Sequence, residues 1–343
     1  MRRVKLKYLL QRWREALFRT WRRQVPALTP QPAEWIEGIY LHKEPVPRRF
    51  FGRRAALKLR YRLYLPRDRH ARGKFPLLVM LHGCSQDATE FAAGTRMNAI
   101  AQEHGCAVLY PEQSSSANAM RCWNWFSREA QQGQGEADLL VHLVQDCLNR
   151  ESVDERRVYI AGMSAGAGMA EILALRNPRL FAASALHSGV MYGAAGSAGE
   201  ALRVMRAGTS VSPVETARRI AQALGLTDML APVLVLHGSL DATVNPRNAE
   251  QIVALRLALA GLPGGVDGLG VPAEETELEM GGRKVRQRDY AREATLLVRS
   301  LLIEGLGHAW SGGDAQLKFN DSNGPDASRM VMDFLLRHRR GQG

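Results

Sequence analysis

The chain has 343 residues, of which 45% are hydrophobic and 7% aromatic, and its formal net charge is +12. This length and apolar content are sufficient for one large core or two modest ones, and they exclude wholesale disorder. Residues 1–25 carry nine Lys or Arg against one acid, Glu15, so most of the excess charge is N-terminal. A nucleic-acid-binding core is therefore not expected, because its basic residues would lie on the folded domain.

The N-terminal segment, residues 1–30, is predicted to be a basic amphipathic helix followed by a linker. Charges interrupt its apolar residues, so it lacks the apolar region of a secretory signal, and no run of about 18 apolar residues could span a membrane. By default, this predicts a cytoplasmic protein. The helix has two interpretations, peripheral contact with anionic membrane or a solvated or self-packed tail. Its apolar residues at helical spacing are Leu6, Leu10, Trp13, Leu17 and Trp21.

Residues 31–343 are predicted to form a single α/β domain. "EWIEGIYLH" and "LKLRYRLYLP" alternate apolar and polar residues, as antiparallel strands do. Short apolar runs typical of buried parallel strands follow: "FPLLVMLHG", "GCAVLYPE", "RRVYIAG", "LFAASALHSG", "APVLVLHG" and "ATLLVRSLLIEG". Helical patterns cover residues 89–103, 136–149, 165–176, 248–260 and 326–338. The alternation predicts a mainly parallel sheet with helices on both faces, whereas residues 191–230 and 261–282 are expected to leave the sheet.

A candidate nucleophile lies between the third of these parallel strands and its helix. Gly162, Met163, Ser164, Ala165 and Gly166 form the pattern G-x-S-x-G, in which a sharp turn lifts the serine hydroxyl above the sheet. The flanking residues must be small so that the strand and the helix can approach each other. The serine also lies at a helix N-terminus, where the dipole favours negative charge.

A serine nucleophile needs a base and an orienting acid, which follow in the order Ser, Asp, His. Asp241 lies in the loop after "APVLVLHG", and His308 lies in the Gly-rich loop after the last strand. Asp228 is the rival acid, but it precedes the strand. His187 and His237 close strands and are expected to be structural.

The oxyanion of an acyl-transfer intermediate needs two backbone donors. One is expected from Ala165, directly after the nucleophile, and the other from Cys84 in the loop that follows "PLLVMLHG". His82 closes that strand and is interpreted as shaping the site and contacting substrate, rather than as a base. The four cysteines form no CxxC pair, so no zinc site is expected.

Several ordered motifs together resemble the polyhydroxybutyrate depolymerase-type esterases, which are α/β-hydrolases related to feruloyl and acetylxylan esterases. The motifs are "VMLHGCSQDATEFAAGTRMNAIAQEHGCAVLYPEQ", "RCWNWF", "GMSAGAGMA", "GLGHAWSGG" and "GPDASRMVMDFLLRH". The resemblance runs from about Gly52 to about Arg339 and implies the α/β-hydrolase fold. It also implies a catalytic triad of Ser164, Asp241 and His308, with Cys84 and Ala165 as oxyanion donors.

The resemblance has further implications around the site. It favours Trp123 and Trp125 as pocket residues over core aromatics, and Trp310 must lie near His308 whatever it does. It also implies a disulfide between Cys84 and Cys122, against the alternative of two reduced thiols in a cytosolic protein. Family members are secreted, so the resemblance points to an extracellular protein. Secreted polymer-degrading members carry a signal peptide and often a polymer-binding domain. Neither is expected from this sequence, and this difference from the family weakens the expectation of action on solid polymer.

The function predicted is that of a serine esterase. Its substrates would be short-chain hydroxyalkanoate oligomers or small acyl, acetyl or feruloyl esters, and hydrolysis through a triad requires no metal or organic cofactor. Two alternatives use the same fold: a peptidase or acyltransferase, and a non-catalytic binding protein. The complete Ser, Asp and His set argues against the second. The oligomeric state is not readable from the sequence.

Overall fold

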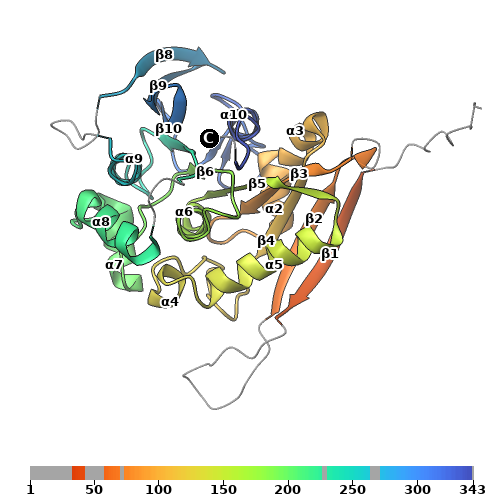
Figure 1. Cartoon of the computed structure of the whole chain (residues 1–343). Helices are drawn as coiled ribbons and strands as arrows, with labels where there is room; N and C mark the ends of the chain where they lie inside the picture. Colours follow the sequence, from red (N-terminus) through yellow and green to blue (C-terminus); the bar gives the residue numbers. More distant parts are fainter. Residues whose placement is uncertain (1–32, 43–57, 70–72, 226–229, 263–270, 342–343) are drawn as a thin grey trace, which may run out of the picture. The chain divides into compact units, whose positions relative to one another are not determined.

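The structure is a computed structural model that describes residues 33–42, 58–69, 73–225, 230–262 and 271–341. The predicted N-terminal helix and linker, and the rival acid Asp228, lie outside these residues. Within them, ten strands form one sheet in the order β1-β2-β4-β3-β5-β6-β7-β10-β9-β8 (Figure 1). These strands are β1 (Glu34–Leu41), β2 (Lys58–Leu65), β3 (Phe75–Leu81), β4 (Ala107–Glu112), β5 (Val153–Met163), β6 (Ala183–His187), β7 (Val233–Gly238), β8 (Glu274–Met280), β9 (Arg283–Arg292) and β10 (Thr295–Ile303).

The middle of the sheet is parallel and both ends are antiparallel. β4, β3, β5, β6, β7 and β10 pair in parallel, whereas β1, β2, β9 and β8 pair antiparallel. A mainly parallel sheet with N-terminal antiparallel strands is the arrangement that the sequence predicts. The carboxyl ends of the parallel strands therefore meet at one edge, where α/β proteins hold their ligands.

Alternate residues of the central strands enter two separate cores, because successive side chains of a strand point to opposite faces. Leu77 and Val79 of β3 join one core, and Leu78 and Met80 join the other. Helices α4 to α9 pack on the first face, and helices α2, α3 and α10 pack on the second (Figure 1). The helices are α2 (Ala88–Thr95), α3 (Met97–His104), α4 (Arg128–Gln131), α5 (Glu136–Arg150), α6 (Ala165–Arg176), α7 (Ala198–Ala207), α8 (Pro213–Leu224), α9 (Arg247–Leu259) and α10 (Ala327–Leu335).

Two expectations for secondary structure were wrong. Residues 89–103 form two helices, because Arg96 adopts a left-handed conformation (φ 54°) and the Gly94 carbonyl accepts a hydrogen bond from the Asp314 amide. The second half of 261–282 does not leave the sheet. β8 pairs with β9 through Gly281 and Gly282, both at positive φ, and this hairpin extends the sheet beyond β10.

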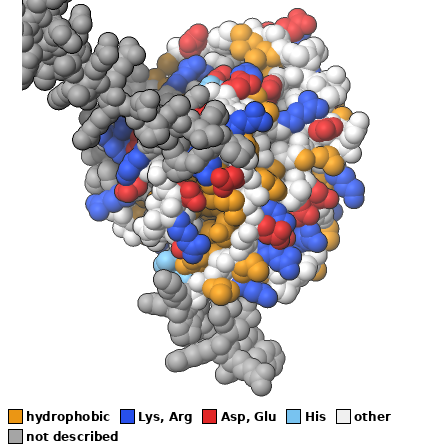
Figure 2. Space-filling model, turned by 90° about the vertical axis from the view of Figure 1, so that its right-hand side faces the viewer, with side chains coloured by type: hydrophobic (Ala, Val, Ile, Leu, Met, Phe, Trp, Pro, Cys, Tyr) orange, Lys and Arg blue, Asp and Glu red, His pale blue; other side chains and the backbone are white. Residues whose placement is uncertain are grey.

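A short two-stranded sheet completes the described elements. β11 (Trp310–Ser311) and β12 (Asn320–Asp321) pair in parallel just after the loop that carries His308. Among the described residues, no helix is long and apolar enough to cross a membrane. The face turned toward the viewer in Figure 2 mixes Lys and Arg with Asp and Glu around hydrophobic side chains, so its charge has no single sign.

Candidate active site

Ser164 occupies the turn between β5 and α6 in a conformation that non-glycine residues rarely adopt, with φ 56° and ψ −122°. Its backbone amide donates to the carbonyl of His187 at 2.9 Å, which ties the turn to the end of β6. Two glycines make the turn sterically allowed. A Cβ on Gly166 would lie 2.1 Å from the Leu81 carbonyl oxygen, and one on Gly162 would lie 2.5 Å from the Gly166 backbone. The motif thus has a packing reason for both glycines.

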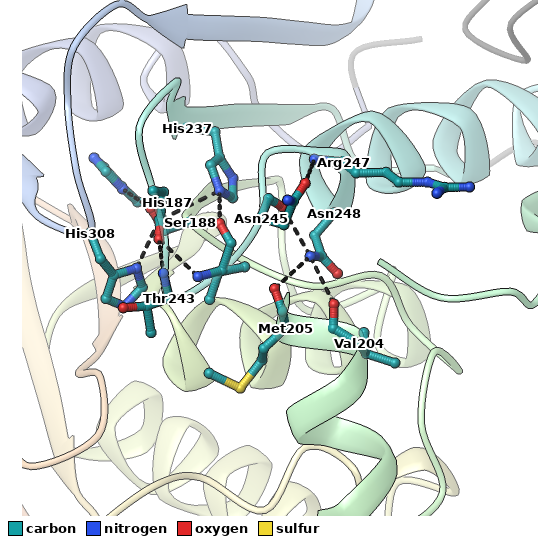
Figure 3. Close-up of polar contacts among 12 residues, drawn as sticks. His187, Ser188, Val204, Met205, His237, Thr243, Asn245, Arg247, Asn248 and His308 are labelled. Carbon is teal, nitrogen blue, oxygen red and sulfur yellow. Dashed lines mark hydrogen bonds and ion pairs between the residues drawn. The ribbon is translucent and has the colours of Figure 1, made fainter. Parts of the chain in front are cut away.

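Asp241 and His308 form a hydrogen-bonded pair at the same edge of the sheet. Asp241 follows β7, His308 follows β10, and these two strands are parallel neighbours. The Asp241 Oδ2 atom lies 2.7 Å from His308 Nδ1. The other carboxylate oxygen, Oδ1, accepts hydrogen bonds from the amides of Thr243 at 3.0 Å and Val244 at 2.8 Å (Figure 3). The acid is therefore held on both oxygens, and it can fix the orientation of the imidazole.

The Asp241 carboxylate is buried yet ionised. Burial alone would raise its pKa, but hydrogen bonding and charge from His308, the Val244 amide and the charge of His237 together hold the pKa below its usual range. The group is consequently negative at neutral pH. A buried carboxylate against Nδ1 favours the tautomer whose Nε2 can accept a proton.

Two buried histidines, His187 and His237, lie next to this pair, a position that the sequence does not indicate. His237 Nε2 lies 2.7 Å from the Val244 carbonyl oxygen and 3.5 Å from Asp241 Oδ2 (Figure 3). His187 stacks on Trp310 with ring centroids 5.0 Å apart. Burial first, and then the charges of His237 and His308, lower the pKa of His187 to about 3. His187 and His237 lie at the ends of β6 and β7, as the sequence predicts. Both side chains are buried next to Asp241.

The loop after β3 lies directly beside the serine. A Cβ on Gly83 would be 3.5 Å from Ser164 Cβ, so the chain at Gly83 and Cys84 passes close to the turn. The Cys84 amide has no hydrogen-bond acceptor among the described residues. Ala165 is the first residue of α6, where backbone amides have no partner within the helix. Both amides are thus available to a group bound next to Ser164.

His82 braces this loop as a neutral ring. Its Nδ1 lies 2.7 Å from the Gly83 carbonyl oxygen, and its Nε2 accepts from the Gln113 amide at 3.1 Å. Burial lowers the pKa of His82 to about 4, so the ring is uncharged at neutral pH. A ring with both nitrogens engaged has no lone pair free for substrate, which agrees with a site-shaping role.

A disulfide joins Cys84 to Cys122 and links the loop after β3 to the loop after β4. Next to it, the Ser85 amide donates to the Met120 carbonyl at 2.7 Å, and the Gln113 side chain donates to the Cys122 carbonyl at 3.2 Å. The two loops are therefore fastened at several points around the Cys84 amide. Cys106 and Cys147 are free and buried.

The three tryptophans proposed near the site are buried. The Trp123 ring packs 5.5 Å from His82, Trp125 packs beside Gly168, and Trp310 donates from Nε1 to Ser328 Oγ at 3.1 Å. All belong to the two cores, so substrate contact by any of them remains a prediction. The aromatic side chain that does reach solvent beside His308 is Phe319, 37% exposed and 6.2 Å from the imidazole edge-to-face. No local sequence pattern indicated it.

Comparison with known proteins gives a family match over residues 59–279, to the family described as "Esterase PHB depolymerase". Poly(3-hydroxyalkanoate) depolymerase C of Paucimonas lemoignei is 35% identical over 182 residues, which are 52% of this chain and 43% of that protein. Acetylxylan esterase A of Emericella nidulans is 31% identical over 180 residues, 50% of this chain and 58% of that one. The chain thus matches about half the length of these relatives.

Among solved structures, an acetyl xylan esterase from Aspergillus awamori aligns with a TM-score of 0.62. The alignment covers 79% of this chain and 94% of that chain, at 19% sequence identity. At this identity the likeness concerns the fold alone, and it supports the α/β-hydrolase architecture.

Proposed function

The chain belongs to the PHB depolymerase family of esterases, and from this premise we propose that it is a serine esterase that hydrolyses carboxylic esters. The observation that carries the proposal is the 2.7 Å hydrogen bond between Asp241 and His308. These residues follow β7 and β10, which are neighbours in the same sheet in which β5 leads into Ser164. Ser164, Asp241 and His308 are more than 60 positions apart in sequence, yet each follows the carboxyl end of a parallel strand of the same sheet, in the chain order that acyl transfer on this fold uses.

In the proposed mechanism, Ser164 Oγ attacks the acyl carbon of the ester while His308 Nε2 takes its proton. The ionised Asp241 holds the imidazole and stabilises the imidazolium that forms. The developing oxyanion accepts hydrogen bonds from the amides of Cys84 and Ala165. His308 returns the proton to the leaving alcohol, the acyl-enzyme forms, and a water activated by the same histidine releases the acid.

The names of the relatives support the proposed substrate class. They act, by those names, on poly(3-hydroxyalkanoate) and acetylxylan, and we propose short-chain hydroxyalkanoate oligomers or small acetyl or feruloyl esters for this chain. The exposed ring of Phe319 beside His308 supports an apolar contact at the entrance, because ester-binding sites are mostly apolar with few polar groups.

Steady-state turnover of a substrate panel tests the proposal. The panel consists of p-nitrophenyl acetate, butyrate and octanoate, methyl ferulate, soluble hydroxybutyrate oligomers and a matched p-nitroanilide. The protein is expected to hydrolyse at least one ester and to leave the amide intact, and Ser164→Ala should lower ester turnover by about 10⁴-fold or more with its fold unchanged. Retention of more than about a tenth of the activity by Ser164→Ala would remove Ser164 from this role, and preferred cleavage of the amide would indicate a peptidase.

A further inference from the structure

Two histidines and an aspartate meet at the end of the edge strand, away from the candidate active site. His42 directly follows β1, and Asp138 and His142 lie in the first turns of α5. One nitrogen or carboxylate oxygen from each of the three lies within 4.8 Å of the others. The rings of His42 and His142 pack edge-to-face with centroids 4.7 Å apart. β2, β4 and β3 lie between β1 and β5 in the sheet, so at the usual strand spacing β1 is about 19 Å from β5, the strand that precedes Ser164.

The donor set has the composition of a transition-metal site. Neutral imidazole nitrogens with one carboxylate suit borderline divalent ions such as Zn²⁺, whereas Mg²⁺ and Ca²⁺ prefer oxygen alone. Bonds of about 2.1 Å to a tetrahedral ion place neighbouring donors about 3.4 Å apart. The side chains of His142 and Asp138 are 40% and 38% exposed, so rotation about their χ angles can close the remaining gap without moving the backbone.

The hydrogen bonds around the cluster leave ligand atoms available. His142 Nδ1 lies 2.9 Å from the Asp138 carbonyl oxygen and 3.3 Å from the Oδ1 atom of the Asp138 carboxylate. With the proton on Nδ1, that bond orients the ring and leaves the Nε2 lone pair free, which is the usual outer-shell arrangement of a metal-bound histidine. His42 Nδ1 is buried and has no hydrogen-bond partner among the described residues. A buried nitrogen left unpaired costs stability, and a bound cation would satisfy it.

We propose that His42, Asp138 and His142 bind one divalent transition-metal ion of the Zn²⁺ type, with water completing its coordination. The ion would fasten the end of the edge strand β1 to α5. Asp138 and His142 are four residues apart on one face of α5, so the helix keeps their backbones together, and His42 supplies the link to the sheet. The proposal does not depend on the esterase activity.

Metal titration of the full chain, freed of metal by chelator and dialysis, tests this site. Calorimetry with Zn²⁺ should give one ion per chain, and Co²⁺ should produce visible d–d absorption bands at the same stoichiometry. Saturating Zn²⁺ should raise Tm by about 2–5 °C, because a ligand that binds only the folded state stabilises it. His42→Ala, Asp138→Asn and His142→Ala should each weaken binding by more than about 10-fold, the scale lost even with outer-shell partners.

His104→Ala provides the matched control. His104 lies 3.9 Å from Asp333 in a pair of the same two residue types, and no third ligand joins them among the residues that the structure describes. This variant should bind Zn²⁺ as the unaltered protein does. The proposal is overturned if stoichiometric binding survives all three cluster variants, if only His308→Ala removes it, or if the unaltered protein shows no saturable binding. Asp138→Asn changes a half-exposed helix residue, so the test does not depend on variants that fail to fold.

Discussion

At the scale of single residues, Asp241 orients the imidazole of His308, the proposed base. Its carboxylate accepts from two backbone amides and from His308, so Asp241→Asn keeps the shape but presents an amide where a carboxylate is needed. Because the amide favours the wrong imidazole tautomer, kcat on a short-chain p-nitrophenyl ester should fall by about 10⁴-fold. Asp228→Asn is the matched control and should retain activity. The reverse outcome, an active Asp241→Asn and an inactive Asp228→Asn, would assign the acid to Asp228.

His82 makes stability depend on pH. Its pKa is lowered to about 4 in the folded protein, so between pH 6.5 and 4 the unfolded chain binds more protons than the folded one. Its stabilising contribution is therefore complete above pH 6.5 and is lost as the pH falls toward 4. From pH 7 to pH 5 the loss is about 2 kcal/mol for this group.

Urea unfolding at pH 7 and pH 5 measures this effect. His82→Gln should be less stable than the unaltered protein at pH 7, and its free energy of unfolding should fall by about 2 kcal/mol less between the two pH values. An unchanged pH dependence in the variant would show that His82 is already protonated in the folded protein or is not buried in it.

The sequence predicts Ser164, Asp241 and His308 because each follows a recognisable strand in a fixed order. It does not predict Phe319 or the contact of His237 with Asp241, because these depend on how loops fold back over the sheet. The proposed metal site also depends on tertiary structure. Asp138 and His142 have helical spacing, but His42 lies almost a hundred residues earlier, and only the placement of β1 beside α5 brings it close.

At the scale of elements, the two loops beside Ser164 are joined by the Cys84–Cys122 disulfide. It closes a loop with a sequence separation of 38 and would contribute about 3–4 kcal/mol through the entropy of the unfolded chain. It also holds the Cys84 amide, and preorganised donors stabilise charge without rearrangement.

Alkylation under denaturing conditions, followed by intact-mass measurement, checks this bond. Without reductant, two cysteines should be alkylated, and peptide mapping should identify them as Cys106 and Cys147; with reductant, all four should react. Four alkylated cysteines in an unreduced, air-exposed sample would show that the bond does not form.

The central strands were predictable because continuous apolar runs ending in Gly or Pro are typical of strands buried on both faces. The β8–β9 hairpin was missed although Gly281-Gly282 between two alternating runs is a hairpin signal. Its strands are rich in Glu and Arg, so they lack the apolar runs that are typical of buried strands. Cross-strand pairs such as Glu277 opposite Arg286 explain how such polar strands are stabilised at the sheet end. The break at Arg96 depends on contacts with residues 314 and 320, which no local pattern reveals.

At the scale of the whole molecule, the arrangement follows from the order of the strands. β5, β6, β7 and β10 are consecutive neighbours, so the loops that carry Ser164, Asp241 and His308 emerge at one edge although the residues are far apart in sequence. The sequence predicts the parallel sheet from its alternating strands and helices, and the triad from the usual order on this fold. The antiparallel extension by β9 and β8 departs from that alternation, because no helix lies between these strands, and its signal is the local Gly281-Gly282 turn.

The central claim is that Ser164 is the nucleophile of an ester-hydrolysing triad, and covalent labelling tests it most directly. The full chain is incubated with a fluorophosphonate, an acyl-transfer mimic that reacts with activated serines, and then measured by intact mass, peptide mapping and residual p-nitrophenyl butyrate turnover. We predict one adduct per chain, on the peptide that contains Ser164, with turnover lost in proportion to labelling and no adduct in Ser164→Ala. An adduct on another residue, or full ester turnover by a protein labelled at Ser164, would contradict the account.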